Sequence, residues 1–284
     1  MKILILGATG MAGHMIALYF KQNKHEVTTF SRKEFKYGNH ILGDVTDFDL
    51  LKKIITTGQY DAVINAVGIL NSQAETNKAT AVLLNSYLPH YLSDLTKKMN
   101  TKIIQMSTDC VFSGKTGGYT ENSLRDGESF YDRSKSLGEI DNDKDLTFRN
   151  SIIGPDLKRD GIGLLNWFMQ QTGVIQGYTA AIWTGVTTLT LAQAMEQAIV
   201  ENLTGIYHLV NGETTSKFEL LHLFNKHLKE KPIPILPDDL LVIDKSLLNH
   251  RSDFSFVVPS YEDMIIELKK WLDHHPELYP HYHQ

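Results

Sequence analysis

The sequence predicts an α/β protein built on a doubly wound parallel sheet, and two observations support this prediction. Five short apolar runs alternate with four helical segments from the first residues through residue 106. A glycine-rich turn, Gly7-Ala-Thr-Gly10-Met-Ala-Gly13, directly follows the first of these runs. Continuous apolar runs are typical of strands in a parallel sheet that helices cover on both faces.

The composition is that of an ordinary soluble protein and excludes several classes. Of 284 residues, 42% are hydrophobic and 21% charged, and the net charge of −5 gives no basic footprint for nucleic acid. The single cysteine, Cys110, excludes an internal disulfide framework and a zinc site of several thiolates, and it fits a reducing compartment. Neither a membrane-spanning apolar run nor a signal-peptide pattern occurs. We therefore expect a cytoplasmic protein that binds neither nucleic acid nor membrane.

The first strand, turn and helix predict a site for a dinucleotide cofactor. Lys2–Leu6 has the pattern of a buried strand, and His14–Gln22 has the pattern of a helix. The glycines between them allow a tight turn and a close approach to a pyrophosphate, whose charge the helix N-terminus receives. The alternative is a turn of small residues that only packs helix on strand. The predicted cofactor contacts in this turn are Gly7, Thr9, Gly10, Met11 and Gly13.

The end of the second strand, Glu26–Ser31, indicates which cofactor binds. A site specific for NAD usually has an acidic residue here for the adenosine 2′-hydroxyl. In this chain Ser31, Arg32 and Lys33 stand there instead, which suits a 2′-phosphate. The sequence therefore favours NADPH, with NADH as the alternative. A solvated basic loop would account for the same residues without a cofactor.

The next two strands end at the same predicted edge of the sheet. His40–Leu42 is expected to be the third strand, with Asp44 and Val45 near the adenine. Asp61–Val67 is a fourth buried run, and the small residues at its end would let a cofactor lie across the sheet edge. A long helix is expected over Glu75–Met99. Further predicted cofactor contacts are Ala66, Val67, Gly68 and Asn85.

The fifth strand and a later helix carry the residues of greatest chemical interest. Thr101–Met106 is expected to be the strand, and its carboxyl end leads into Ser107-Thr108-Asp109-Cys110-Val111-Phe112. Tyr131 and Lys135 share one face of a helix expected over Tyr131–Glu139. A lysine charge beside the phenol would lower the tyrosine pKa from about 10, which suits proton transfer to or from a carbonyl. The alternative is an ordinary exposed helix face.

The second half is expected to rejoin the sheet and to add a smaller lobe. Asp145–Asn150 is the sixth predicted strand, and Gly154-Pro155 ends the pattern. Thr187–Val200 has the pattern of an amphipathic helix, and Gly205–Leu209 that of a last strand. We predict a dinucleotide-binding domain of residues 1–155 and about 186–211, and a substrate-binding lobe of residues 156–185 and 212–284. The elements expected to complete the lobe are Thr215–Leu228, Pro232–Pro237 and Tyr261–Leu272.

Several residues of the second half have two interpretations. Lys158 and Arg159 are either diphosphate contacts or solvated loop charges, and Trp183 is either a stacking surface or core. The tail histidines suggest a metal site, but they lack a carboxylate or cysteine framework and lie at a terminus. We therefore expect no metal there. These histidines are His274, His275, His281 and His283.

Taken together, these motifs resemble those of a known family. The glycine pattern, Ser107-Thr108-Asp109 and Tyr131-x-x-x-Lys135 are similar to those of extended short-chain dehydrogenases/reductases. Residues 107–114, 119–121 and 131–139 resemble the dTDP-4-dehydrorhamnose reductase branch, and the similarity is dense over residues 1–155 and looser beyond. The resemblance implies a Rossmann-type doubly wound sheet with a smaller C-terminal substrate-binding lobe.

The resemblance also implies a role for each residue. Thr108 would hydrogen-bond the substrate carbonyl oxygen, and Tyr131 would donate a proton to that oxygen as hydride arrives from the nicotinamide. Lys135 would bind the nicotinamide ribose and hold the pKa of the tyrosine down, so the tyrosine and lysine also count as cofactor contacts. An alkoxide developing at the carbonyl needs such a donor and proton source. The expected substrate contacts are Asp109, Cys110, Val111 and Phe112.

Three departures from the branch bear on the substrate. Cys110 stands where a tyrosine is usual, Asp132 where a glycine is common, and the segment after Asn65 differs. The related dehydratases carry an Asp-Glu pair after the threonine, so Cys110 in place of that glutamate favours reduction over 4,6-dehydration. Cys110 itself is expected to be a filler, because no nearby histidine would activate it. Asp109 is either a strand-end cap or a substrate contact.

Three functional hypotheses follow. The leading one is NADPH-dependent reduction of the 4-keto group of a nucleotide-linked 6-deoxy sugar, for polysaccharide precursor synthesis. The second is reduction of a UDP-linked 4-keto-6-deoxy-N-acetylhexosamine, because the departures lie on the substrate side. The third is a regulatory subunit that binds NADP without turnover, although such relatives usually lose part of the Thr-Tyr-Lys set that this chain keeps. A homodimer is expected from the family alone.

Overall fold

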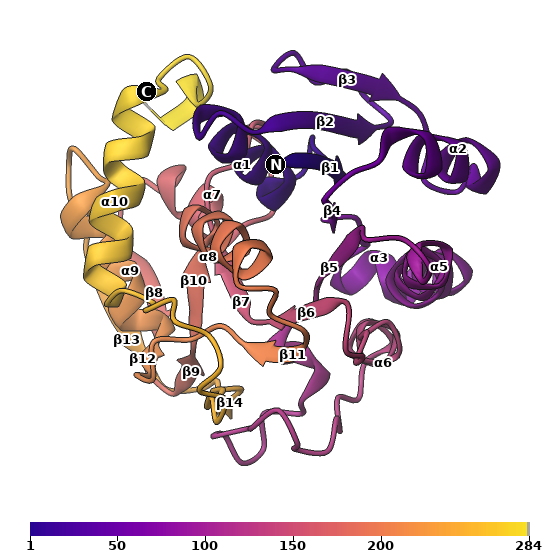
Figure 1. Cartoon of the computed structure of the whole chain (residues 1–284). Helices are drawn as coiled ribbons and strands as arrows, with labels where there is room; N and C mark the ends of the chain where they lie inside the picture. Colours follow the sequence, from indigo (N-terminus) through magenta and orange to yellow (C-terminus); the bar gives the residue numbers. More distant parts are fainter. Residues whose placement is uncertain (283–284) are drawn as a thin grey trace.

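One parallel sheet of seven strands organises the protein, whose computed structural model describes residues 1–282 (Figure 1). The strand order is β11-β6-β5-β4-β1-β2-β3, so the chain builds outward in both directions from the β1–β4 pair. Ligands of such sheets bind where the order reverses, at the carboxyl ends of the strands. The predicted doubly wound fold is confirmed. The strands are β1 (Lys2–Leu6), β2 (Glu26–Ser31), β3 (Asn39–Leu42), β4 (Ala62–Asn65), β5 (Lys102–Met106), β6 (Leu146–Arg149) and β11 (Gly205–His208).

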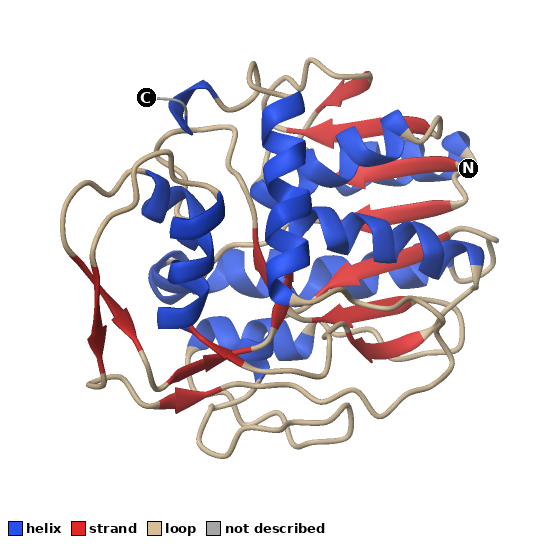
Figure 2. Ribbon diagram, turned by 90° about the vertical axis from the view of Figure 1, so that its left-hand side faces the viewer, coloured by secondary structure: helices blue, strands red, loops and turns tan. Residues whose placement is uncertain are grey.

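Helices cover both faces of the sheet (Figures 1 and 2). Ile3 and Ile5 of β1 pack in one apolar cluster with α1 and α8, whereas Leu4 and Leu6 pack on the opposite face with α2 and α5. All four side chains are fully buried, as expected because successive residues of a strand point to opposite faces. The helices are α1 (Met11–Gln22), α2 (Phe48–Gly58), α5 (Leu88–Thr96) and α8 (Thr188–Val200).

The predicted alternation of five strands with four helical segments fails between β2 and β3. Residues 32–38, which join the adjacent parallel strands β2 and β3, contain no helix. A helix rises only about 1.5 Å per residue, whereas an extended chain spans up to about 3.3 Å per residue. Seven residues are therefore too few to form a helix and also return along the sheet.

The long helix predicted over Glu75–Met99 is confirmed for its main part, Lys78–Thr96, but it is not one regular α-helix. The chain forms α3 (Asn71–Thr76), α4 (Lys78–Ala81), a π-helical turn η1 (Val82–Tyr87) and then α5. Asn77 interrupts the run because its backbone leaves the helical region, with φ −122° and ψ 61°. π-Turns are rare and often occur at functional sites, and this one contains Asn85.

The helix that carries the Tyr-Lys pair is α6 (Phe130–Leu137), and its start depends on a local capping box. The Ser129 hydroxyl accepts from the Asp132 N–H (3.0 Å), and the Asp132 carboxylate accepts from the Ser129 N–H (3.1 Å). Two backbone donors that would otherwise lack partners are thus satisfied. Asp132, a departure from the family pattern, stabilises the first turn of the helix.

The second half adds three small sheets beside the central one (Figure 2). In these sheets β7 pairs with β10, β8 with β13, and β9 lies between β12 and β14. The last predicted strand does rejoin the central sheet, because β11 pairs in parallel with β6. These strands are β7 (Ser151–Ile153), β8 (Ile175–Tyr178), β9 (Ala181–Trp183), β10 (Gly185–Thr187), β12 (Thr215–Ser216), β13 (Ile235–Asp238) and β14 (Ile243–Asp244). The remaining helices are α7 (Leu164–Met169), α9 (Lys217–His227), α10 (Tyr261–His274) and the 3-10 turns η2 (Asp109–Val111) and η3 (Pro280–Tyr282).

Both halves share one apolar core, so the predicted division into two domains stays a prediction. A single cluster of buried side chains includes Ile5 and Phe20 from the first half and Leu191, Leu268 and Trp271 from the second. Among residues 1–282, no helix is both long and apolar enough to cross a membrane.

A chain of buried hydrogen bonds ties the C-terminal segment to the glycine turn. The Trp271 indole N–H donates to the Tyr279 hydroxyl (3.2 Å), and that hydroxyl donates to His14 Nε2 (2.9 Å). His14 Nδ1 then donates to the Gly10 carbonyl (3.0 Å), since a carbonyl can only accept. Burial lowers the pKa of His14 to about 4, so the ring is neutral at pH 7.

We predict that acid destabilises the protein partly through this histidine. Between pH 6.5 and about 4 the unfolded chain binds a proton at His14 that the folded protein does not, so the free energy of unfolding falls as pH falls. The expected slope is about 1.4 kcal/mol per pH unit for this residue. In urea unfolding measured from pH 7.5 to 4.5, the free energy of unfolding should fall less steeply in His14→Gln than in the wild type. His90→Gln, at an exposed position, is the control, and equal slopes in both variants would contradict the assignment.

Candidate active site

Ten of the predicted cofactor contacts surround one pocket, which we call the glycine-turn pocket. It has a volume of about 480 Å³ and lies at the carboxyl ends of β1, β2 and β4. The structure thus brings together segments that are far apart in the sequence. These lining residues are Gly7, Thr9, Gly10, Ser31, Arg32, Asp44, Val45, Ala66, Val67 and Gly68.

The glycines make this turn possible through space and backbone conformation. Gly7 has φ +85°, which L side chains rarely adopt. A Cβ on Gly13 would lie 2.2 Å from the Gly7 carbonyl oxygen, so Gly13 allows the helix to approach the strand closely. Gly13 therefore shapes the pocket without lining it. The Met11 side chain also lies outside it and approaches Gly163 of the second half.

Positive charge gathers at the rim of the glycine-turn pocket. Arg32 and Lys33 line it from the first half, and Lys158 lines it from the second. The Asp44 pKa is lowered by hydrogen bonds from Thr46, chiefly from its backbone N–H (3.0 Å), and further by the nearby Arg32. Lys158, which the sequence predicts as either a diphosphate contact or a loop charge, therefore lines this pocket.

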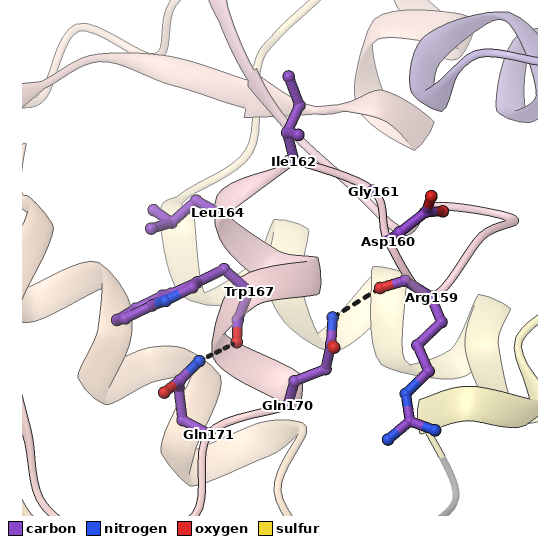
Figure 3. A pocket seen from close by; sticks show the side chains of 8 residues that line it. All are labelled: Arg159, Asp160, Gly161, Ile162, Leu164, Trp167, Gln170 and Gln171. Atoms are coloured by element: carbon purple, nitrogen blue, oxygen red, sulfur yellow. Dashed lines mark hydrogen bonds between the residues drawn. The ribbon is translucent and has the colours of Figure 1, made fainter.

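Arg159, the neighbouring candidate, lines a different hollow on the surface (Figure 3). Its backbone carbonyl accepts a hydrogen bond from Gln170 Nε2 (2.8 Å), while its guanidinium points away from the other labelled side chains. Trp167 borders this surface hollow too, and its carbonyl accepts from Gln171 Nε2 (2.9 Å). The side-chain amides of Gln170 and Gln171 already donate to backbone carbonyls. None of the predicted cofactor or substrate contacts lines this hollow.

Asn85 hydrogen-bonds segments that border the candidate site. Its side-chain amide donates to the Ile69 carbonyl and the Ser134 hydroxyl and accepts from the Ile69 N–H, each at 3.0 Å. It therefore joins the loop after β4 to the helix α6. The residue is fully buried and does not line the pocket.

Thr108, Tyr131 and Lys135 are buried close together. Thr108 begins the turn η2 and accepts from the Cys110 N–H (3.1 Å), and its hydroxyl donates to the Asp109 carboxylate (3.0 Å). Thr108 also acts on the pKa of Tyr131 and lowers it, which partly offsets the effect of burial. Tyr131 also packs in one cluster with Ile69, which lines the glycine-turn pocket, and with Cys110.

The expected effect of Lys135 on the tyrosine is wrong for this structure. Burial raises the pKa of Tyr131 above its ordinary value of 10, and the nearby Cys110 adds to the rise. The Lys135 ammonium donates to the Met106 carbonyl (2.6 Å), and burial lowers the pKa of Lys135 to about 8. Helical spacing places the two residues on one face, but burial is the largest influence on the pKa of Tyr131. Tyr131 is therefore a neutral phenol that can donate a proton.

Asp109 and Cys110 line a second pocket of about 470 Å³, which we call the lysine pocket. Burial raises the pKa of Asp109, although Lys217 and Lys245 partly offset this. Burial also raises the pKa of Cys110 to about 12, so the sulfur is a thiol, as the filler interpretation expects. Aromatic residues and lysines that line the lysine pocket are Trp167, Tyr178, Trp183, Lys217 and Lys245.

Two predicted substrate contacts point elsewhere. Val111 and Phe112 are fully buried and pack with Tyr119 and Leu247 in a separate cluster. The Phe112 ring stacks on Tyr119 with 4.3 Å between ring centroids. Asp109 and Cys110 thus line the lysine pocket while the next two residues pack in another cluster, which a linear motif does not reveal.

Sequence reasoning missed both lysines of the lysine pocket. Lys217 has one recognisable signal, because Ser216 and Glu219 form a capping box that makes Lys217 the first residue of α9. A cation at that end opposes the helix dipole. Lys245 follows β14 and has no comparable signal.

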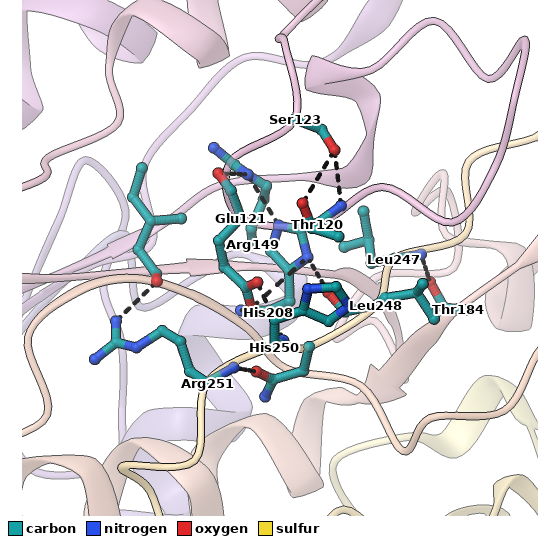
Figure 4. Close-up of polar contacts among 12 residues, drawn as sticks. Thr120, Glu121, Ser123, Arg149, Thr184, His208, Leu247, Leu248, His250 and Arg251 are labelled. Carbon is teal, nitrogen blue, oxygen red and sulfur yellow. Dashed lines mark hydrogen bonds and ion pairs between the residues drawn. The ribbon is translucent and has the colours of Figure 1, made fainter.

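A buried ion pair fixes the catalytic segments relative to each other. The Glu139 carboxylate accepts from Arg149 Nε (2.8 Å) and Nη2 (2.7 Å), from the Ser107 hydroxyl (2.6 Å) and from Arg125 (3.0 Å). Arg149 Nη1 also donates to His208 Nε2 (2.9 Å) (Figure 4). Burial would raise the pKa of Glu139, but these hydrogen bonds, chiefly from Arg149, hold it below its usual value.

We predict that removing one partner of this ion pair strongly lowers the stability of the protein. Glu139→Gln leaves the Arg149 charge buried and unpaired, so the free energy of unfolding should fall by about 3–5 kcal/mol. Adding Arg149→Met should restore part of the loss, because no charge then remains buried. Glu128→Gln breaks an exposed pair with Lys115 and should not shift the denaturation midpoint. Equal stability of Glu139→Gln and the wild type would contradict the prediction.

The fold and the glycine-turn pocket define a dinucleotide-binding α/β protein. The model of the RmlD substrate binding domain family matches residues 1–153, more than half of the chain, and the chain belongs to this family. The family expected from the motifs is thereby confirmed.

Individual relatives agree with this assignment. The chain is 30% identical over 141 residues to a dTDP-4-dehydrorhamnose reductase of Aggregatibacter actinomycetemcomitans, which covers 49% of this chain and 45% of the relative. It is 28% identical over 231 residues to the enzyme of that name from Burkholderia thailandensis, covering 76% and 74%. The chain thus spans about half the length of some of the curated relatives it matches.

Solved structures share the fold. The dTDP-4-dehydrorhamnose reductase of Bacillus anthracis in complex with NADP superimposes with a TM-score of 0.78, over 94% of this chain and 98% of its own. At 20% sequence identity, the likeness shows the common architecture.

Proposed function

We propose that this protein reduces the 4-keto group of a nucleotide-linked 6-deoxy sugar with NADPH, in the synthesis of polysaccharide precursors. The observation that carries the proposal is the position of Tyr131, which belongs to one apolar cluster with Ile69 of the glycine-turn pocket and Cys110 of the lysine pocket. A phenol between a cofactor site and a substrate site can complete the reduction of a carbonyl. The names of the relatives support the choice of sugar.

The residues of the glycine-turn pocket fit a phosphorylated dinucleotide. Gly7 and Gly13 leave the room that a pyrophosphate needs, and Arg32 would meet the 2′-phosphate. Bound there, NADPH would supply the hydride. Lys135 would contact its ribose.

The chain's own residues would then handle the carbonyl oxygen. The Thr108 hydroxyl, which donates to Asp109 here, would turn its hydrogen to the substrate oxygen. Tyr131 would donate its proton to the same oxygen as negative charge develops, and the raised pKa of the phenol keeps that proton available. Solvent would then return a proton to the tyrosine.

We predict that Tyr131→Phe nearly abolishes turnover. Loss of the proton donor should lower kcat by about 10²- to 10⁴-fold, while binding of NADPH persists. The measurement is NADPH consumption with dTDP-4-dehydro-6-deoxyhexose, together with a cofactor titration. Full activity of this variant would refute the mechanism.

We also predict that Arg32 determines the preference for NADPH. Arg32→Ala should raise the KM for NADPH about tenfold, or about 1.4 kcal/mol, and leave the KM for NADH unchanged. Arg159→Ala is the matched control, because Arg159 lies outside the glycine-turn pocket. An equal effect on both cofactors would argue against a 2′-phosphate contact.

A UDP-linked 4-keto-6-deoxy-N-acetylhexosamine is the second candidate substrate. Cys110 supports it, because this small side chain lines the lysine pocket where the branch usually has a tyrosine. Comparing kcat/KM for the two nucleotide sugars decides between them. A regulatory subunit without turnover is less well supported, because the catalytic set is complete and buried together.

The setting of the enzyme is part of the proposal. A single cysteine fits a cytoplasmic location, and the family resemblance suggests a homodimer. Cell fractionation and light scattering of the purified protein test these two points.

A further inference from the structure

The lysine pocket contains two cations that the proposed reaction does not use. Lys217 and Lys245 line it together with Asp109 and Cys110, the residues that follow Thr108. Within residues 1–282, neither lysine forms an ion pair with a carboxylate. Both act electrostatically on Asp109, so their charges lie near the catalytic end of the pocket.

Lys217 occupies a position that destabilises the folded protein. It is the first residue of α9, where the helix dipole disfavours a cation. Burial lowers its pKa to about 8, although Asp109 partly offsets the shift. Residues that violate such local preferences commonly stand at functional sites.

The surroundings hold these cations in place. The Lys217 ammonium lies 5.1 Å from the centroid of the Trp183 ring. Trp183 is 2% exposed, and its indole N–H has no hydrogen-bond partner in the described part of the chain. The Lys245 stem packs against Gly114, where a Cβ would lie 2.8 Å from Lys245 Cγ. Two cations without a carboxylate partner therefore line one pocket beside the Trp183 ring.

We propose that Lys217 and Lys245 bind an anionic oxygen group of the substrate, a phosphate or a carboxylate. Phosphate and carboxylate are the acceptors that such donors favour. The diphosphate of a nucleotide sugar is the favoured source. Trp167 and Tyr178 line the same pocket and are 40% and 42% exposed, so their rings are available to stack on a base. The inference rests on the proposed function, because it names the part of that substrate which these residues recognise.

The test compares Lys217→Met with Lys226→Met, which lies on the same helix outside the lysine pocket. Calorimetric titration would use dTDP, inorganic pyrophosphate and neutral thymidine. Lys217→Met should weaken the binding of dTDP and pyrophosphate at least tenfold and leave the affinities for thymidine and NADPH unchanged. Lys226→Met should have the affinities of the wild type. Lys217→Met should also melt at a temperature no lower than the wild type, because the destabilising buried cation is gone. A purely structural lysine would instead lower the melting temperature and leave the dTDP affinity unchanged.

Two further arms complete the experiment. Titration with glucuronate in place of dTDP tests recognition of a carboxylate. If only the binding of glucuronate depends on Lys217, the recognised group is a carboxylate. Lys245→Met repeats the titrations independently should Lys217→Met fail to fold. Wild-type affinity for all anions in both variants would overturn the site. Intact anion binding without NADPH consumption on any keto sugar would instead count against the proposed function.

Discussion

The buried ion pair between Glu139 and Arg149 is the interaction on which the candidate site most depends. Their side chains are 0% and 1% exposed, and either charge alone would be very costly there. Every hydrogen bond that satisfies Glu139 therefore becomes a constraint on position. Ser107 ties the pair to the end of β5, next to Thr108, while Glu139 itself follows α6, which carries Tyr131 and Lys135. One electrostatic requirement thereby aligns the two segments that the chemistry needs together.

Burial also shifts the pKa values of the groups around the carbonyl position. It raises the pKa values of Tyr131 and Cys110 and lowers that of Lys135, in each case favouring the neutral form. A neutral phenol suits the direction of the proposed reaction, which consumes a proton at the carbonyl oxygen. Low polarity around the hydroxyls also strengthens each hydrogen bond to a developing alkoxide.

The second half of the chain contributes to both pockets. Lys158 reaches the glycine-turn pocket, while Lys217 and Lys245 line the lysine pocket. The C-terminal segment also supports the cofactor turn, since Tyr279 binds His14 and His14 binds the Gly10 carbonyl. These contacts and the shared apolar core therefore join the two predicted domains.

Local sequence was sufficient for the sheet and for most of the glycine-turn pocket, because a strand, its turn and the next helix are contiguous in the chain. Gly7, Gly10 and the residues after each strand could be assigned since parallel strands present their carboxyl ends at one edge. Tertiary structure alone decided that Lys135 binds the Met106 carbonyl, that Phe112 faces a separate core, and that Lys217 lines one pocket with Asp109. Those outcomes depend on desolvation and on contacts between distant segments, which no local spacing encodes.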